Sequence, residues 1–241
     1  MEELNINSLL DRNSIEMQLI QSLNYFEENK NNVLTKRGIY IYGSPGSGKS
    51  YFVKSVLKKL NYDIISFDAG DIRNKSVIET ITKHNMSDKN ILSLFKKVNK
   101  KIAIIMDEID GMNSGDKGGI NALIKLIRPK KTKKQKKEQI TMTPIICIGN
   151  YHIDKKIKEM MKICTSIEIK QPTNLQIKKI VTILMPNIES TLKENIVNFI
   201  QGDLRKLKST HDIYKTQHTI LKNQLIKNIF QKKNYNEDTK E

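Results

Sequence analysis

The sequence has few of the residues and segments that mark several classes of protein. It contains no Trp and only two Cys, at positions 147 and 164. Neither Cys belongs to a Cys/His pattern suited to zinc, and two thiols make no disulfide framework, so we expect Cys147 and Cys164 to be core thiols. No apolar run approaches the roughly 20 residues that a membrane-spanning helix needs. The first residues, MEELNINSLLDRNSIEMQ, lack the basic and then apolar order of a signal peptide, so we expect an intracellular protein.

Acidic residues are scarce relative to basic ones. The chain has 42 Lys and Arg against 26 Asp and Glu, which gives a formal net charge of +16. Such an excess attracts polyanions, above all nucleic acid. Part of the lysine content also fits an AT-rich genome, in which case those lysines have no specific role.

A lysine run at positions 129–139, PKKTKKQKKEQ, concentrates this charge between a predicted helix and a predicted strand. The position indicates an insertion in a loop. Three interpretations stay open: the run binds DNA, it is a nuclear localisation signal, or it is a solvated loop. The lysines concerned are Lys130, Lys131, Lys133, Lys134, Lys136 and Lys137.

Short apolar runs alternate with helix-like stretches along the first two thirds of the chain. Five runs predict strands, at 38–43, 62–70, 101–108, 143–150 and 165–172. Helices are predicted before and between them, at 15–26, 50–60, 72–83 and 118–128. This alternation predicts an α/β fold, with helices covering both faces of a five-stranded, mostly parallel sheet. Pro172 and Thr173 then supply a break and a helix cap, so the predicted domains are 1–170 (α/β), 171–229 (helical lid) and 230–241 (polar tail).

The segment GSPGSGKS matches the full phosphate-loop pattern, with a predicted strand directly before it and a predicted helix directly after. Its glycines let backbone N–H groups face phosphates, and the helix N-terminus adds its dipole. Lys49 is expected to reach the β- and γ-phosphates, and Ser50 to ligate magnesium. The predicted nucleotide-binding residues are Gly43, Ser44, Pro45, Gly46, Ser47, Gly48, Lys49 and Ser50, and a chance glycine turn is the alternative.

Three carboxylates in four positions follow the apolar run 102–106. Adjacent carboxylates at the end of a buried strand require something positive to meet them. In a phosphate-loop protein, Asp107 supplies the second magnesium contact, and Glu108 orients and deprotonates an attacking water. The pair predicts hydrolysis of a nucleoside triphosphate, with helix capping as the alternative. Asp110 is expected to be a cap or turn residue, because alternation turns it away from the pair.

Two further polar residues occupy positions suited to the same chemistry. Asn150 ends the predicted strand IICIGN, where its amide could hold the attacking water beside Glu108. Arg205 lies in GDLR, in the first turn of a lid helix, from which a guanidinium could reach the γ-phosphate. Each is a weak signal alone. Their order after the phosphate loop and the acid pair makes the pattern specific.

That order resembles the AAA+ ATPases, in which a phosphate loop, a Walker B acid pair, a sensor Asn and a sensor Arg follow one another. The stretches SFDAGDIRNKSVI and IIMDEIDGMNSGDKGGINALIKLI are similar to the large subunit of replication factor C type clamp loaders. The resemblance implies an AAA+ three-layer domain with a helical lid, ATP and Mg²⁺ as cofactors, and catalytic roles for Glu108, Asn150 and Arg205. It also implies clamp-loader small subunits, a sliding clamp and primer–template DNA as partners, in the nucleus or at a viral replication site in the cytoplasm.

The same resemblance implies where DNA would contact the chain. In clamp loaders, DNA phosphates meet the N-terminal ends of the helices that follow the second and third strands, and Arg73, Lys75 and Lys117 occupy these places here. Contacts of this kind carry no base specificity. Within the lysine run, the DNA-binding candidates are Lys130, Lys131, Lys133 and Lys134.

Departures from the family leave two other functions open. Ile163 stands where small subunits carry the Arg of a Ser-Arg-Cys motif, so the chain is not expected to supply an arginine finger to a neighbour, in agreement with a large subunit. Neither a collar domain after the Arg205 region nor a BRCT domain before the ATPase is expected, which fits a trimmed viral form. The alternatives are an AAA+ helicase loader or remodeller, and a scaffold that binds ATP without hydrolysing it. A small-molecule kinase fits least, because Asn150 and Arg205 would have no role in it.

Overall fold

The computed structural model describes residues 6–76, 78, 100–112, 118–136, 138, 140–151 and 154–216. It forms two compact units, which we describe separately. The α/β unit comprises Asn13–Ser44 and Lys49–Ile169, and the lid unit comprises Met1–Arg12, Pro45–Gly48 and Lys170–Glu241. The main boundary thus lies one residue from the predicted one, but two short segments predicted in the α/β domain pack with the lid. The predicted end of the lid at 229 and the tail 230–241 lie outside the described residues.

The α/β unit is built on five parallel strands, which confirms the predicted fold class. In spatial order they are β2 (Tyr62–Phe67), β3 (Lys101–Met106), β4 (Ile145–Gly149), β1 (Gly38–Tyr42) and β5 (Thr165–Glu168). Each neighbouring pair is parallel. Both faces of such a sheet are buried, which explains why β4 is apolar at nearly every position. The strands end before the polar residues that follow them, so Asp107 and Asn150 stand at the carboxyl edge.

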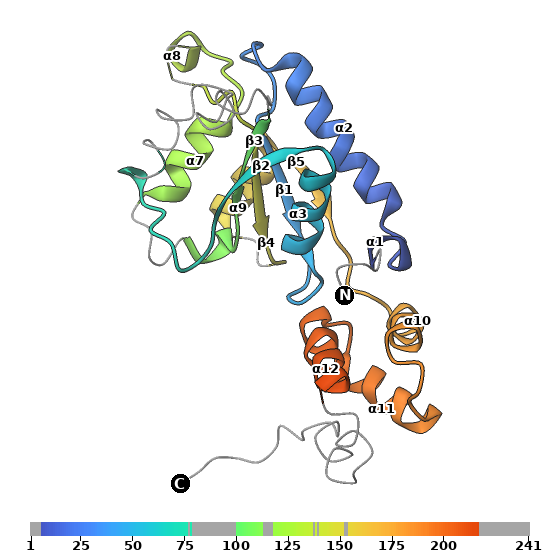
Figure 1. Ribbon diagram of the computed structural model, residues 1–241. Coiled ribbons are helices and arrows are strands. Elements are labelled where there is room, and N and C mark those ends of the chain that lie inside the picture. Colours follow the sequence, from blue (N-terminus) through green and yellow to red (C-terminus); the bar gives the residue numbers. More distant parts are fainter. Residues whose placement is uncertain are drawn as a thin grey trace, which may run out of the picture. The chain divides into compact units, whose positions relative to one another are not determined.

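Helices cover both faces of this sheet, as Figure 1 shows. On one face lie α2 (Asn13–Asn29) and α3 (Lys49–Lys59), and on the other lie α7 (Gly119–Ile127) and α9 (Lys155–Ile163). Successive side chains of β3 point to opposite faces of the sheet. Ile105 therefore joins the core under α2 and α3, whereas Ile104 joins the core under α7. Both cysteines are free and buried as predicted, and burial raises the pKa of the Cys164 thiol to about 12.

The lid unit has its own apolar core. It contains α1 (Ile6–Leu9), α10 (Asn174–Leu184), α11 (Ser190–Ile200) and α12 (Leu204–Thr216). Ile6 and Leu10 are buried among residues of α10, α11 and α12, so the N-terminal segment is part of this core. Thr173 caps α10 together with Gln176, which confirms the predicted cap. Among the described residues, no helix is both long enough and apolar enough to cross a membrane.

Candidate nucleotide site

The phosphate loop follows β1 and leads into α3, the order that the motif requires. Gly46 and Gly48 have φ values of 72° and 83°, in the left-handed region that favours glycine. A Cβ atom at Gly46 would also clash with the carboxyl group of Asp203. Ser47 Oγ is buried without a hydrogen-bond partner among the described residues, which leaves a polar atom for a phosphate group to satisfy. These features fit a nucleotide.

Within the lid unit, two polar contacts hold the loop residues 45–48. The backbone N–H of Leu204 donates to Gly46 O over 2.8 Å. The buried guanidinium of Arg12 donates through Nη2 to Ser47 O over 2.6 Å. Burial lowers the pKa of Arg12 to about 10, so the side chain still carries its charge at neutral pH. A positive charge is therefore fixed beside the loop that is expected to hold phosphates.

Lys49, at the start of α3, has its ammonium group positioned by three oxygens. Nζ donates to Gly43 O over 3.0 Å, to Ser44 O over 2.8 Å and to Asn150 Oδ1 over 3.0 Å. The side chain is only 8% exposed. The predicted phosphate-binding lysine and the predicted sensor Asn are thus in direct contact.

Asn150 is oriented from its other side by Asp110. Its Nδ2 donates to Asp110 Oδ2 over 2.9 Å, and its backbone N–H donates to Asp110 Oδ1 over 3.3 Å. Only one orientation of the amide satisfies both neighbours, with the oxygen toward Lys49 and the NH₂ group toward the carboxylate. A Cβ atom at Gly149 would lie 2.5 Å from Tyr40 Oη and 3.0 Å from Asp110 Oδ1, so the approach of these groups requires a glycine.

The expectation that Asp110 is a cap or turn residue is confirmed, and the contact with Asn150 adds a second role. Asp110 does lie in a short 3₁₀ turn, η1 (Ile109–Gly111), but its carboxylate also reaches Asn150 at the edge of β4. Tyr40 lies buried beside it, and burial first, then the charge of Asp110, raises the pKa of the Tyr40 hydroxyl. Asp110 is therefore a positioning residue of the site.

Ser50 and Asp107 meet directly, as the motif predicts. Ser50 Oγ donates to Asp107 Oδ2 over 2.5 Å, and the backbone N–H of Glu108 donates to Asp107 Oδ1 over 2.9 Å. A hydroxyl and a carboxylate are the hard oxygen ligands that Mg²⁺ prefers, and Mg²⁺ in nucleotide sites is held by few protein ligands together with phosphates. The residues present fit this ion, with Ser50 and Asp107 as its protein ligands.

Glu108 has an unusual backbone conformation for a residue other than glycine. Its φ and ψ are both 48°, in the left-handed region, and its side chain is exposed. Such a conformation costs on the order of 1 kcal/mol and is found preferentially at functional sites. This conformation ends the strand geometry directly after Asp107. The side chains of Asp107 and Glu108 therefore need not point to opposite faces of the sheet, as successive side chains do in a strand.

Arg205 and Ile163 lie in different units. Arg205 is exposed in the first turn of α12, where Asp203 Oδ1 accepts a hydrogen bond from its backbone N–H over 2.8 Å. Ile163 is the last residue of α9 and packs partly buried against the core. The position predicted to lack an arginine finger is thus an apolar packing position.

Two residues predicted to contact DNA are buried, which corrects those predictions. Arg73 is only 2% exposed, and its Nη1 donates to the carbonyl oxygen of Asp107. Lys130 is fully buried, and its ammonium group pairs with Glu138. Lys75 is exposed, whereas Lys117 lies outside the described residues. Arg73 therefore contacts the backbone of the acid pair rather than solvent.

Sequence reasoning missed Arg12 as a functional candidate, and it missed the contact of Asp110 with Asn150. Both act on residues far away in the chain: Arg12 and Ser47 are 35 positions apart, and Asp110 and Asn150 are 40 apart. The one signal for Asp110 is its place in DEID, where it is the third carboxylate after a buried strand.

Comparisons with known proteins agree with this geometry. The chain is 29% identical to replication factor C subunit 1 of Saccharomyces cerevisiae over 182 residues, which cover 71% of this chain and 20% of that protein. It is 28% identical to the replication factor C large subunit of Nanoarchaeum equitans, over 81% of this chain and 41% of that one. The chain thus spans about a fifth to two fifths of the length of these relatives.

Among solved structures, the RuvB Holliday junction branch migration motor of Thermotoga maritima superposes with a TM-score of 0.56. The sequences are 14% identical, and the match covers 90% of this chain and 67% of that one, which shows a shared fold. A model of the ATPase family associated with various cellular activities (AAA) matches residues 39–175, more than half of the chain. The chain belongs to this AAA family.

Proposed function

We propose that this chain is an ATPase subunit of a clamp loader, similar to the large subunit of replication factor C, that helps to load a sliding clamp onto primed DNA. The observation that carries the proposal is the chain of contacts from Lys49 through Asn150 to Asp110, beside the Ser50–Asp107 pair. These contacts support a site in which Lys49 binds phosphate, Asn150 positions water, and Ser50 and Asp107 hold Mg²⁺. Similarity to replication factor C large subunits supports the choice of clamp loading among AAA functions.

Each residue has a role in this proposal. Lys49 binds the β- and γ-phosphates, and Ser50 and Asp107 hold Mg²⁺, which neutralises phosphate charge when it is bound. Glu108 accepts a proton from the attacking water, and Asn150 orients that water. Arg205 contacts the γ-phosphate from the lid, so that nucleotide state changes the lid. We propose that the assembly has one conformation that binds DNA and another that releases it. ATP favours the DNA-binding conformation only if ATP binds that conformation more tightly than the releasing one.

Partners complete the proposed activity. Ile163 leaves this chain without an arginine finger to offer, so small subunits, a sliding clamp and primer–template DNA are the proposed partners. DNA phosphates are expected at Lys75 and Lys117. We place the activity where DNA is replicated; the relatives named above are cellular proteins, so they give no support to a viral site.

A substitution of Glu108 tests hydrolysis in the complex that copurifies with the tagged full-length chain. Glu108→Gln should reduce ATP turnover at this site at least about a hundredfold while ATP binding stays intact, because only proton abstraction is lost. Glu159→Gln, an exposed change of the same charge on α9, is the matched control. Unchanged turnover in Glu108→Gln would favour an ATP-bound scaffold.

Adding a sliding clamp tests the partner. We expect the clamp together with primed DNA to increase the ATP turnover of the wild-type complex. A complex whose turnover does not respond to the clamp would be a remodeller of another kind.

A further inference from the structure

The lysine run is not a free solvated loop, because contacts hold both of its ends. We call residues 128–138 the basic loop. The backbone N–H of Lys130 donates to Val33 O over 2.8 Å. Just beyond the loop, Thr141 O accepts a hydrogen bond from the buried guanidinium of Arg37 over 2.5 Å. Entry and exit are therefore fixed against the same segment, which leads into β1.

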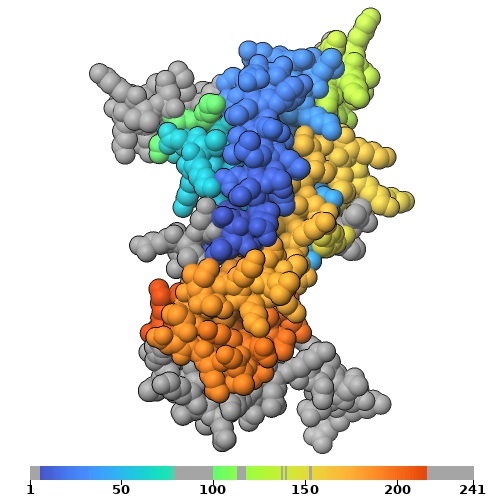
Figure 2. All heavy atoms as spheres, turned by 90° about the vertical axis from the view of Figure 1, so that its right-hand side faces the viewer, coloured from blue at the N-terminus to red at the C-terminus, as the bar shows by residue number. Residues whose placement is uncertain are grey.

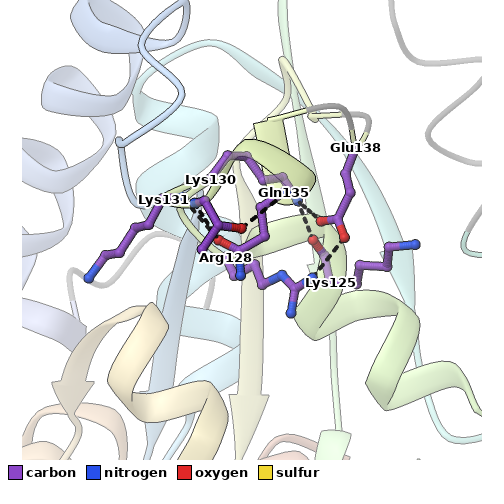
Figure 3. A network of polar contacts seen from close by, with 7 residues as sticks. Lys125, Arg128, Lys130, Lys131, Gln135 and Glu138 are labelled. Atoms are coloured by element: carbon purple, nitrogen blue, oxygen red, sulfur yellow. Dashed lines mark hydrogen bonds and ion pairs between the residues drawn. The ribbon is translucent and has the colours of Figure 1, made fainter.

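A buried ion pair anchors the loop from inside (Figure 3). Lys130 Nζ donates to Lys125 O over 2.5 Å and to Glu138 Oε2 over 3.0 Å. Arg128 Nη2 donates to the other carboxylate oxygen, Oε1, over 2.8 Å. Burial of an ammonium group is costly unless it is hydrogen-bonded and paired, and Glu138 supplies the negative charge that pairs with Lys130. The pair joins the two ends of the loop.

The outer part of the loop is also ordered by its own hydrogen bonds. It forms a helical turn, α8 (Lys133–Lys136). Gln135 Oε1 accepts hydrogen bonds from the backbone N–H groups of Lys131 and Thr132 over 3.0 and 3.1 Å, and Thr132 Oγ1 accepts one from the Gln135 N–H over 3.2 Å. These contacts fix the backbone near Lys131, Lys133, Lys134 and Lys136.

The anchor separates the charges of the loop into two sets. Glu138 is the only acidic residue between Gly118 and Ile153, and Lys130 and Arg128 already neutralise it. The second set is exposed to solvent, and Figure 3 shows the Lys131 side chain directed away from Glu138. Figure 2 shows the loop, in yellow-green at the upper right, projecting from the surface. Among the loop residues that the structure describes, the exposed set is Lys131, Lys133, Lys134 and Lys136.

We propose that the basic loop is a preformed docking surface for the phosphate backbone of DNA, in which the Lys130–Glu138 pair fixes the loop and the four exposed lysines contact phosphates. The choice of DNA among polyanions rests on the proposed function. A fixed backbone lowers the entropy that the surface loses on binding. Lysine–phosphate contacts carry no base specificity, so the surface contributes affinity rather than sequence selection.

Removal of the exposed charges tests the contact. The full-length chain, without nucleotide, is titrated into a fluorescent primer–template DNA, and binding is followed by anisotropy at several salt concentrations. Replacing Lys131, Lys133, Lys134 and Lys136 by Ser should weaken binding at least about tenfold at moderate salt and reduce the slope of log K against log salt by about 3. The matched control replaces four exposed lysines of α3 and α9: Lys54, Lys58, Lys158 and Lys162.

Glu138→Gln tests whether the loop must be preformed. The change adds one positive charge, so simple charge attraction predicts tighter DNA binding. Our proposal predicts weaker binding, by about threefold or more, because the anchor of the loop is lost while all four exposed lysines remain. Glu159→Gln makes the same charge change at an exposed site on α9, and it should strengthen binding slightly or leave it unchanged.

The outcomes separate this inference from the proposed function. Equal weakening by the two fourfold variants, tighter binding by Glu138→Gln, or no binding of the wild-type chain to DNA would each overturn the docking surface. Unchanged DNA binding with loss of nuclear accumulation in the fourfold loop variant would assign the loop to an import receptor instead. None of these results alters the clamp response of ATP turnover, which tests clamp loading alone. If Glu138→Gln does not fold, the comparison of DNA binding by the two fourfold lysine variants still tests the docking surface.

Discussion

The phosphate loop and the basic loop each hold a buried lysine, but the partners of the two ammonium groups differ. Lys49 Nζ donates to two backbone carbonyls and to the amide oxygen of Asn150. Lys130 Nζ donates to one carbonyl and to the carboxylate of Glu138. Carbonyl and amide oxygens orient an ammonium group without neutralising it, whereas a carboxylate neutralises it.

This difference in hydrogen-bond partners bears on which lysine in each region is suited to bind a ligand. In the phosphate loop, carbonyl and amide oxygens orient the ammonium group of the buried lysine, and these contacts do not themselves cancel its charge. In the basic loop, the buried lysine is neutralised and structural, and the ligand-binding role passes to its exposed neighbours. Burial alone therefore does not identify a functional lysine, because the buried ammonium groups of Lys49 and Lys130 have different surroundings.

The largest effect expected from this comparison is at Lys49. Lys49→Ala removes the cation that we propose binds the β- and γ-phosphates, and ATP turnover should fall at least about a hundredfold, as for loss of one preorganised donor to a developing charge. The measurement is steady-state ATP turnover of the purified complex, with ATP affinity measured separately. Lys49→Arg keeps the charge and serves as the control. Equal turnover in wild type and Lys49→Ala would show that phosphate is bound elsewhere.

The next largest effect is expected at Asp110, which orients the Asn150 amide that contacts Lys49. Asp110→Asn keeps the size of the side chain but removes the negative charge and one of the two acceptor oxygens, so the backbone N–H and Nδ2 of Asn150 no longer both have a carboxylate acceptor and the amide is held less firmly. We expect kcat to fall about tenfold while KM for ATP changes little, because the lost interaction is a charge-assisted hydrogen bond and ATP binding relies on other groups.

A double-mutant cycle distinguishes this positioning role from a general loss of structure. Once Asn150 is replaced by Ala, the further change Asp110→Asn should have almost no effect on kcat, since Asp110 acts on turnover through the Asn150 side chain. Additive effects of the two substitutions would remove Asp110 from the site.

The sequence was sufficient for features defined by local pattern. Gly43 to Ser50 form a motif between a strand and a helix, and the apolar runs of the α/β unit were recognisable as strands, although polar residues at their ends shortened them. Long-range pairs were not recognisable. Lys49 and Asn150 are 101 positions apart, and no periodicity reports that their side chains touch.

The lysine run shows the same limit in another form. Composition identified a basic segment, but six similar lysines give no sign that one of them turns inward to meet Glu138. The N-terminal segment is a third case: Ile6 and Leu10 look like the approach to the following helix, yet they complete the core of the lid. In each case the missing information is which distant group a side chain packs against.

The comparison within the basic loop predicts different costs for two neighbouring lysines. Lys130→Met removes one partner of a buried pair and leaves Glu138 with Arg128 alone, so the free energy of unfolding should fall by about 2 kcal/mol. Lys131→Met changes an exposed side chain and should change it by less than about 0.5 kcal/mol. Urea unfolding of the two variants, followed by circular dichroism, measures both values. Equal costs would contradict an anchoring role for Lys130.

The smallest expected effect is the pH dependence of the anchor. Burial alone would raise the pKa of Glu138, but its hydrogen bonds and ion pairs with Lys130 and Arg128 outweigh burial and lower that pKa below its ordinary value of 4.5. A carboxyl group with a lowered pKa in the folded state stabilises the fold above its ordinary pKa, and it loses this contribution as pH falls through the lowered value. The stability advantage of wild type over Glu138→Gln should therefore be constant near neutral pH and shrink below pH 4.5. Other carboxyl groups titrate alike in both proteins, so the difference isolates Glu138, and an advantage that persists unchanged into acid would mean that the ionised pair does not hold the basic loop.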